Sequence, residues 1–185
     1  NQDVIVYTVR SITKHEISKF RDFKIYRCID IIYICIMILV TGGTGLVGSH
    51  LLFDLIFSGK AVKAIKRHGS NINMVKRVFQ YYTDDPGLFG KIEWVEADIL
   101  DICSLEEAMK GISQVYHCAA VVSFYPEDRD KMMKTNVEGT ANVVNAALIS
   151  GVPGFCYVSS TAAIGKDING GINTEQTEWN RESAS

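Results

Sequence analysis

Short apolar runs alternate with segments of helical periodicity along most of this chain, starting at Met37. The runs predict strands at 37–41, 61–66, 91–96, 114–119 and 155–159. The periodic segments predict helices at 46–58, 71–82, 105–110 and 128–149. This alternation predicts an α/β fold, a Rossmann-type doubly wound parallel sheet with helices on both faces. We expect the strand order 3-2-1-4-5, with a ligand crevice at the carboxyl ends of strands one and four.

Residues that start or stop helices mark several of the predicted boundaries. Three glycines follow periodic segments and predict their ends: Gly59, Gly111 and Gly151. Ser104, with Glu107 three residues later, has the pattern of a capping box, so we expect Ser104 to cap the helix over 105–110. The polar segment 166–185 predicts a loop.

The first 36 residues lack this pattern. Residues 31–40 form an apolar run that is too short to cross a bilayer and leads directly into a glycine-rich turn. Because Met37 stands where the first strand begins, we expect it to be the authentic start. Residues 1–36 are then an unstructured or non-native extension, either translated upstream sequence or a cloning artefact. A native extension or membrane-proximal anchor is the alternative.

Composition narrows the function classes. The chain has 185 residues and a net charge of −2, which gives no support for a nucleic-acid-binding surface. Its five cysteines form no Cys-x-x-Cys pair and its four histidines are isolated, so we expect neither a disulfide framework nor a metal site. Cys118 and Cys156 fit small buried apolar positions. We expect a cytoplasmic protein without a membrane or nucleic-acid partner.

The most informative segment runs from Met37 to His50, where an apolar strand, a glycine turn and an apolar helix follow one another. This geometry places a pyrophosphate at a helix N-terminus, where unpaired N–H groups and the positive end of the helix dipole meet the anion. The three glycines serve the sharp turn, the approach to phosphate and the packing of helix on strand, respectively. The alternative is a plain glycine-rich turn. We predict dinucleotide contacts at Gly42, Thr44, Gly45, Leu46, Val47 and Gly48.

Further candidate contacts follow the later strands. No carboxylate follows strand two, and Arg67 there fits a 2′-phosphate, which favours NADP over NAD; a solvated basic turn is the alternative. Asp98 after strand three is expected to accept from the adenine amino group while Ile99 packs on the ring, although Asp98 would also suit a turn cap. The small Ala119 and Ala120 after strand four let the backbone pass the ribose and nicotinamide, or serve only helix–sheet packing.

Together these motifs resemble the extended short-chain dehydrogenase/reductase superfamily of NAD-dependent epimerases/dehydratases. The resemblance runs from Met37 to about Gly165 and is carried by five segments: 41–48, 98–99, 117–120, 135–140 and 157–161. The stretch 119–124 followed by 136–140 looks closer to the dihydroflavonol reductase and 3β-hydroxysteroid dehydrogenase branch than to sugar epimerases.

The resemblance implies roles for individual residues. Asn136 matches the family's helix Asn, which orders the active-site end near the cofactor. Ser160 matches the catalytic Ser/Thr that polarises the substrate oxygen, with Ser159 and Thr161 as fallback positions. Ser159 is also expected to contact the cofactor. A strand-end turn is the alternative for the serine pair.

One departure from the family pattern bears on activity. The family's general acid is a Tyr in a Tyr-x-x-x-Lys step, and no Tyr of this chain has a Lys at that spacing. We therefore expect residues 37–185 to be an incomplete NAD(P)-binding domain, inactive alone, of an oxidoreductase acting on a carbonyl or alcohol substrate. A nucleotide-sugar epimerase/dehydratase and a non-catalytic dinucleotide sensor are the alternatives. A small-molecule substrate and a homodimer of the full-length protein are the expected partners.

Overall fold

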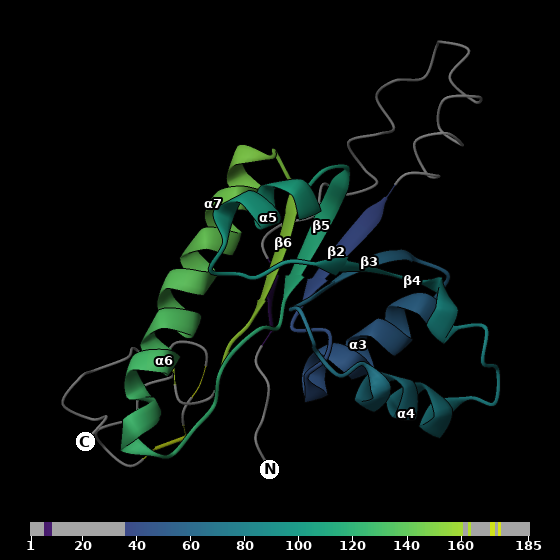
Figure 1. Ribbon diagram of the computed structural model, residues 1–185, viewed down its shortest axis with the longest axis horizontal. Coiled ribbons are helices and arrows are strands. Elements are labelled where there is room, and N and C mark those ends of the chain that lie inside the picture. Colours follow the sequence, from purple (N-terminus) through teal and green to yellow (C-terminus); the bar gives the residue numbers. More distant parts are fainter. Residues whose placement is uncertain (1–5, 9–35, 161–162, 164–170, 173, 175–185) are drawn as a thin grey trace, which may run out of the picture.

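The computed structural model describes residues 6–8, 36–160, 163, 171, 172 and 174. One sheet forms its centre (Figure 1). Its strands are β1 (Val6–Thr8), β2 (Met37–Thr41), β3 (Ala61–Lys66), β4 (Ile92–Glu96), β5 (Ile112–His117) and β6 (Gly154–Val158). All five strands predicted from the apolar runs are therefore present, with ends shifted by up to two residues.

The strand order is β1-β6-β5-β2-β3-β4. The five strands from β2 to β6 run parallel, and their arrangement confirms the predicted order 3-2-1-4-5 and the doubly wound Rossmann fold. The short strand β1 pairs antiparallel with β6, with Tyr7 opposite Tyr157. Sequence reasoning did not predict β1. The rest of the predicted extension and nearly all of the segment 166–185 lie outside the described residues.

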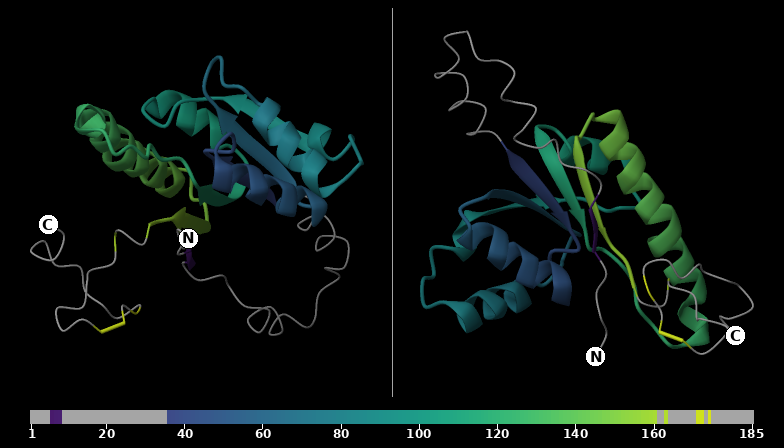
Figure 2. Two further views of the ribbon diagram at one scale, coloured as in Figure 1. Left: turned by 90° about the horizontal axis from the view of Figure 1, so that it is seen from below. Right: turned by 180° about the vertical axis from the view of Figure 1, so that it is seen from behind.

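Helices cover both faces of the sheet (Figure 2). One face carries α3 (Leu46–Phe57) and α4 (Asn73–Tyr82), and the other carries α5 (Ile102–Ala108) and the long helix that contains α6 (Arg129–Met133) and α7 (Thr140–Ile149). Short 3₁₀ turns precede β4 at Phe89–Lys91 and precede α6 at Pro126–Asp128.

Two apolar clusters hold these layers together. Leu39 and Val115 point toward α5 and α7 and pack with Val143, whereas Ile38 and Val40 point the other way and pack with α3 and α4. This alternation along β2 is the period of two that a strand imposes on its side chains. A strand apolar at every position is therefore what a sheet covered on both faces requires.

Two local expectations were wrong in detail. Helix α5 begins at Ile102, and its N-cap is Asp101, whose side chain accepts from the Cys103 N–H at 3.1 Å. Ser104 instead lies inside the first turn and donates to the Asp101 carbonyl oxygen at 3.0 Å. Asp101 precedes Ser104 in the chain, and its carboxylate caps the free N–H of Cys103. The helix therefore starts three residues earlier than predicted.

The long helix is also less regular than its periodicity predicts. Between α6 and α7, Lys134–Gly139 adopts a π-helix, so the whole element is continuous but locally widened. Single π turns inside α-helices are frequent at functional sites. Within the described residues, no helix is long and apolar enough to serve as a membrane span.

Candidate cofactor site

The turn between β2 and α3 is built on glycines at positions where a side chain would collide. Gly42 has a φ of +66°, and the Gly45 N–H donates to the Gly42 carbonyl oxygen at 2.9 Å. A Cβ on Gly42 would lie 2.6 Å from the Ala119 backbone nitrogen. A Cβ on Gly48 would lie 2.2 Å from the Gly42 carbonyl oxygen. A side chain at Gly42 would push the turn away from β5, and a side chain at Gly48 would push α3 away from the turn.

The first turn of α3 faces the space above this loop without a cap of its own. Its N-cap residue is Gly45, which has no side chain to cap the helix, and no acidic residue lies in the first turn. Leu46 and Val47 are exposed there. The first N–H groups of a helix have no intrahelical partner and carry the positive end of the dipole. The turn therefore offers the donors and the field that a pyrophosphate needs, and the residues present fit a dinucleotide.

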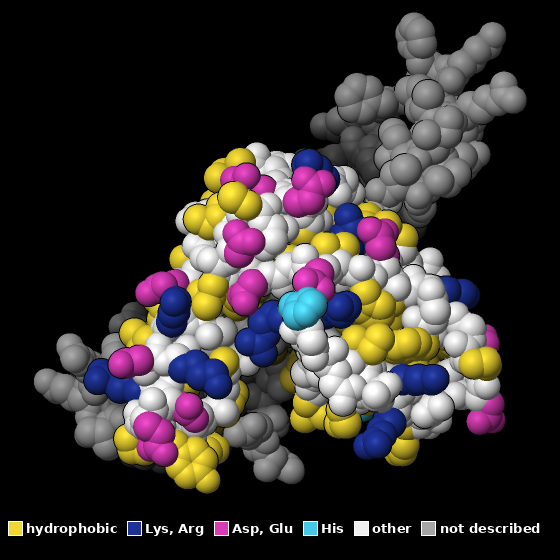
Figure 3. Space-filling model, in the orientation of Figure 1, with side chains coloured by type: hydrophobic (Ala, Val, Ile, Leu, Met, Phe, Trp, Pro, Cys, Tyr) yellow, Lys and Arg dark blue, Asp and Glu magenta, His cyan; other side chains and the backbone are white. Residues whose placement is uncertain are grey.

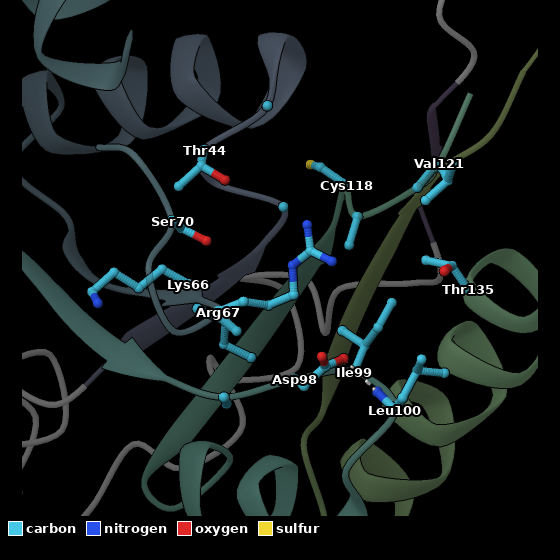
Figure 4. Close-up of a pocket in the computed structure, with 16 residues that line it drawn as sticks. Thr44, Lys66, Arg67, Ser70, Asp98, Ile99, Leu100, Cys118, Val121 and Thr135 are labelled. Carbon is cyan, nitrogen blue, oxygen red and sulfur yellow. Dashed lines mark hydrogen bonds between the residues drawn. The ribbon is translucent and has the colours of Figure 1, made fainter. Parts of the chain in front are cut away.

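A cavity of about 280 Å³ lies at the carboxyl ends of β2, β3, β4 and β5. Of the predicted cofactor contacts, it is lined by Gly42, Thr44, Gly45, Arg67, Asp98, Ile99, Ala119 and Ala120. On the face shown in Figure 3, acidic, basic and histidine side chains gather near the middle of the described surface. Figure 4 shows the labelled residues around the cavity, which come from the glycine turn, the ends of β3 and β4, the segment after β5 and the π-helix.

The basic residues after β3 differ in their partners. Lys66 Nζ lies 3.8 Å from Glu96 Oε2, and His68 Nδ1 lies 3.0 Å from Glu96 Oε1. The Arg67 backbone carbonyl oxygen accepts from the Ser70 N–H at 3.0 Å, but the Arg67 guanidinium has no hydrogen bond or ion pair with any described residue. In Figure 4 its guanidinium points into the cavity, whereas the Lys66 side chain points the opposite way. Arg67 therefore offers an unpaired cation to a ligand in the cavity.

Asp98 caps a turn, which is one of the two roles that the sequence left open, and it also lines the cavity. Its Oδ1 accepts from the Leu100 N–H at 2.9 Å, which fixes the turn after β4. The Asp98 N–H in turn donates to the Ser104 hydroxyl at 3.2 Å. The carboxylate is therefore held in place from within its own turn while it faces the cavity. Ile99 beside it is buried and packs against Gly139, where a Cβ would lie 2.6 Å from Ile99 Cδ1.

A buried histidine connects the ends of β2 and β5 with the start of α7. Thr41 Oγ1 lies 2.6 Å from His117 Nδ1, and His117 Nε2 lies 2.9 Å from Thr140 Oγ1. The Ala119 N–H donates to Thr41 Oγ1 at 3.3 Å. Thr41 and His117 are fully buried. This network was not predicted, because its members are far apart in the sequence.

The directions of these hydrogen bonds follow from their donors. The Ala119 N–H can only donate, so every polar hydrogen finds an acceptor when the Thr41 hydroxyl donates to His117 Nδ1. The other ring nitrogen of His117 then donates to Thr140. Burial lowers the pKa of His117 to about 4, so the ring is neutral at pH 7, as this arrangement requires.

Asn136 holds the loop that follows β5. Its Nδ2 donates to the Val121 carbonyl oxygen at 2.8 Å and its Oδ1 accepts from the Val121 N–H at 2.8 Å. The oxygen and the nitrogen of its side-chain amide thus both bind the backbone of Val121, which lines the cavity. The π-helix carries Asn136 together with Thr135, which itself lines the cavity. Asn136 therefore positions the cavity wall and is not itself part of the lining.

The remaining predicted contacts lie near the cavity but outside its lining. Leu46, Val47 and Gly48 form the start of α3, behind the glycine turn. Ser159 and Ser160 follow β6 at the same edge of the sheet, and the Ser160 carbonyl oxygen accepts from the Ala163 N–H at 2.9 Å. Thr161 lies outside the described residues.

Several lining residues were not among the predicted contacts: Ile65, Lys66, Ser70, Ala97, Leu100, Cys118, Val121 and Thr135. Most directly adjoin a predicted residue, so the positions of the strand ends would have identified them. Thr135 required knowledge of how the long helix lies. Burial raises the pKa of the Cys118 thiol to about 12, so it lines the cavity as an unreactive group. Among the described residues, no group of three His, Cys, Asp or Glu side chains is arranged to hold a metal ion.

Comparisons with known proteins agree with this geometry. The model of the NAD dependent epimerase/dehydratase family matches residues 38–184. A putative dihydroflavonol 4-reductase from Synechocystis sp. is 34% identical over 126 residues, which cover 68% of this chain and 33% of that protein. Aldehyde reductase 2 from Sporidiobolus salmonicolor is 35% identical over 151 residues, 80% of this chain and 42% of that protein.

A solved structure shows the same fold. The crystal structure of gox2253 matches with a TM-score of 0.64 at 31% identity, over 79% of this chain and 41% of that one. The chain thus spans between about a third and about two fifths of the length of these relatives.

Proposed function

This chain belongs to the NAD dependent epimerase/dehydratase family, and on that basis we propose that it is the NAD(P)-binding part of a reductase. The reaction would take place at a carbonyl or alcohol carbon, as in enzymes of the dihydroflavonol reductase type. The observation that carries the proposal is the cavity between the glycine turn and Asp98, with the unpaired Arg67 inside it. Two relatives at 34% and 35% identity are named as reductases, which supports the same branch.

Each part of the cavity has a role in this proposal. The glycine turn and the first turn of α3 bind the pyrophosphate. Asp98 accepts from the adenine amino group through the oxygen not used by Leu100, and Ile99 packs beside the ring. The backbone at Ala119 and Ala120, held by the Thr41–His117 network, borders the ribose and nicotinamide. A bound nicotinamide cofactor supplies hydride transfer, and the chain supplies position and polarity.

At the substrate end, the Ser160 hydroxyl would donate to the substrate oxygen and polarise the carbonyl. Asn136 fixes the position of the cavity wall through its two hydrogen bonds to the Val121 backbone. We expect this chain alone to bind cofactor weakly and to turn over little substrate, because it has no Tyr-x-x-x-Lys step.

The cofactor of this proposal is NADP, or NAD with lower affinity. The end of β3 carries no carboxylate that would repel a 2′-phosphate, and the Arg67 guanidinium is free to pair with one through two N–H groups. Replacing Arg67 by Ala should weaken NADPH binding about 10-fold to 100-fold, as expected for a charge-assisted hydrogen-bonded pair. NADH binding should change less than about twofold, because it lacks this phosphate.

Fluorescence titration with both nucleotides measures these affinities. Arg77→Ala is the matched control, since Arg77 lies exposed on α4 and does not line the cavity. Unchanged NADPH affinity in Arg67→Ala would remove Arg67 as the phosphate ligand. A wild-type chain that binds neither nucleotide would refute the proposed cofactor site.

Two rival functions are separated by other observations. The family includes epimerases, so the full-length protein would be assayed for NADPH oxidation with carbonyl compounds and for interconversion of nucleotide sugars. Our proposal predicts NADPH oxidation, and sugar interconversion without net NADPH consumption would favour the epimerase.

For the sensor, the deciding observation is the source gene beyond codon 185. A helix there that carries Tyr-x-x-x-Lys supports an enzyme, whereas loss of the Tyr or Lys supports a sensor.

A further inference from the structure

Glu96, the last residue of β4, lies beside the cavity and contacts two of the three basic side chains at the end of β3, which are Lys66, Arg67 and His68. Its Oε2 lies 3.8 Å from Lys66 Nζ and its Oε1 lies 3.0 Å from His68 Nδ1. Lys66 and Glu96 are also direct register partners across the β3–β4 pair. The one carboxylate therefore holds the basic residues on both sides of Arg67.

The position of Lys66 shows what this contact does. Lys66 precedes Arg67 in the chain and is among the residues that line the cavity. Figure 4 nevertheless shows the ammonium group pointing away from the Arg67 guanidinium. A lysine has a flexible four-carbon stem, so the direction of its ammonium group depends on the partner that holds it. Glu96 is that partner in this structure.

We propose that Glu96 is a specificity-determining residue that limits the preference of this site for NADP. It holds Lys66 away from the region where Arg67 would bind a 2′-phosphate, and its own negative charge opposes a phosphate nearby. This inference rests on the proposed binding of NADP through Arg67. With Glu96 present, the wild-type chain should therefore prefer NADP over NAD less strongly than it would if the three basic residues acted without Glu96.

The test compares NADPH and NADH affinities of the chain and its Glu96→Gln variant by fluorescence titration at low ionic strength. The ratio of the NADH to the NADPH dissociation constant should rise about threefold to tenfold, entirely through tighter NADPH binding. NADH affinity stays constant and confirms that the variant is folded. Added salt should reduce the gain, because the released charge acts through solvent.

The matched control is Glu93→Gln. Glu93 pairs with Lys63 at 3.5 Å across the same two strands, and neither residue lines the cavity. This variant should leave the nucleotide ratio unchanged. When the Glu96→Gln change is made in a Lys66→Met background, the gain should be smaller, because the released ammonium group is gone and only the loss of the Glu96 charge remains.

Three results would overturn the inference. The ratio could stay constant or fall in Glu96→Gln, which would mean that Glu96 arranges the cations for phosphate. The gain could be undiminished in the Lys66→Met background, which would remove Lys66 from the account. The control could match Glu96→Gln, which would reduce the effect to general surface charge. If the wild-type chain binds neither nucleotide, the proposed function itself fails; if it binds both and Glu96 is without effect, only this inference fails.

Discussion

The two halves of the cavity are held in place by different means. On the side of β2, β3 and β4, the shape comes from the backbone: the left-handed Gly42, the closed turn to Gly45 and the turn around Asp98. These contacts join residues that are close in sequence. The Arg67 guanidinium on this side has no partner among the described residues, whereas Asp98 and Lys66 each have one.

On the side of β5 and α7, buried side chains set the shape. Thr41, His117 and Thr140 form one hydrogen-bonded network, and Asn136 holds the Val121 backbone from the neighbouring helix. These contacts join residues separated by 15 to 76 positions. The comparison teaches that the half proposed to bind phosphate depends on glycine geometry, whereas the half proposed to border the nicotinamide depends on long-range polar contacts.

The largest effect is expected where the backbone half is broken. In Gly48→Ala, the new Cβ would lie 2.2 Å from the Gly42 carbonyl oxygen, so α3 must move away from the turn. We expect the free energy of unfolding to fall by about 1–3 kcal/mol and NADPH affinity to fall about 100-fold or more. Urea unfolding and nucleotide titration measure the two effects.

Gly90→Ala is the control for this change, because a Cβ there would have no heavy atom within 4 Å and Gly90 has no positive φ. It should leave both quantities nearly unchanged. Full NADPH binding by Gly48→Ala would show that the glycine turn does not hold the pyrophosphate.

The histidine network predicts a dependence of stability on pH. Burial lowers the pKa of His117 from 6.5 to about 4, so the folded protein binds fewer protons than the unfolded chain between these values. The stabilisation is complete above pH 6.5 and is lost as the pH falls toward 4. The loss should reach about 3 kcal/mol.

Urea unfolding of the wild type and of His117→Gln at a series of pH values isolates this contribution, because other titrating groups affect both proteins equally. The difference in unfolding free energy between the two should shrink as the pH falls from 7 to 4. Parallel pH profiles would mean that His117 has the same pKa in the folded and unfolded protein, so that burial does not disfavour its charged form.

A smaller effect is expected when the clamp on the Val121 backbone is removed. Asn136→Ala loses two hydrogen bonds of 2.8 Å, which should lower the unfolding free energy by about 1–2 kcal/mol and NADPH affinity about threefold to tenfold. Asn145→Ala, at an exposed position on α7, is the matched control and should change neither. Equal effects of the two variants would reduce Asn136 to an ordinary helix residue.

The same contrast explains what the sequence could predict. The strands, their order and the glycine turn were predictable because apolar periodicity and glycine spacing are local patterns. The roles of His117 and Thr140 were not, since a histidine between apolar residues gives no sign of which distant hydroxyls it meets. The start of α5 was missed because Asp101 and Ser104 both suit a cap, and only the chain path decides between them. The π-helix was not predicted, because the periodicity of 128–149 indicates one regular helix.

The most direct test of the central claim, that this cavity binds a nicotinamide dinucleotide, is a titration of the chain with NADPH followed by amide NMR. We expect the largest shifts at Gly42, Gly45, Arg67 and Asp98, with amides near Thr83 at the far end of α4 unaffected. Such a map would place the nucleotide across the glycine turn and the ends of β3 and β4. The account would be contradicted if no amide shifted at a high NADPH concentration, or if the shifts were confined to α4.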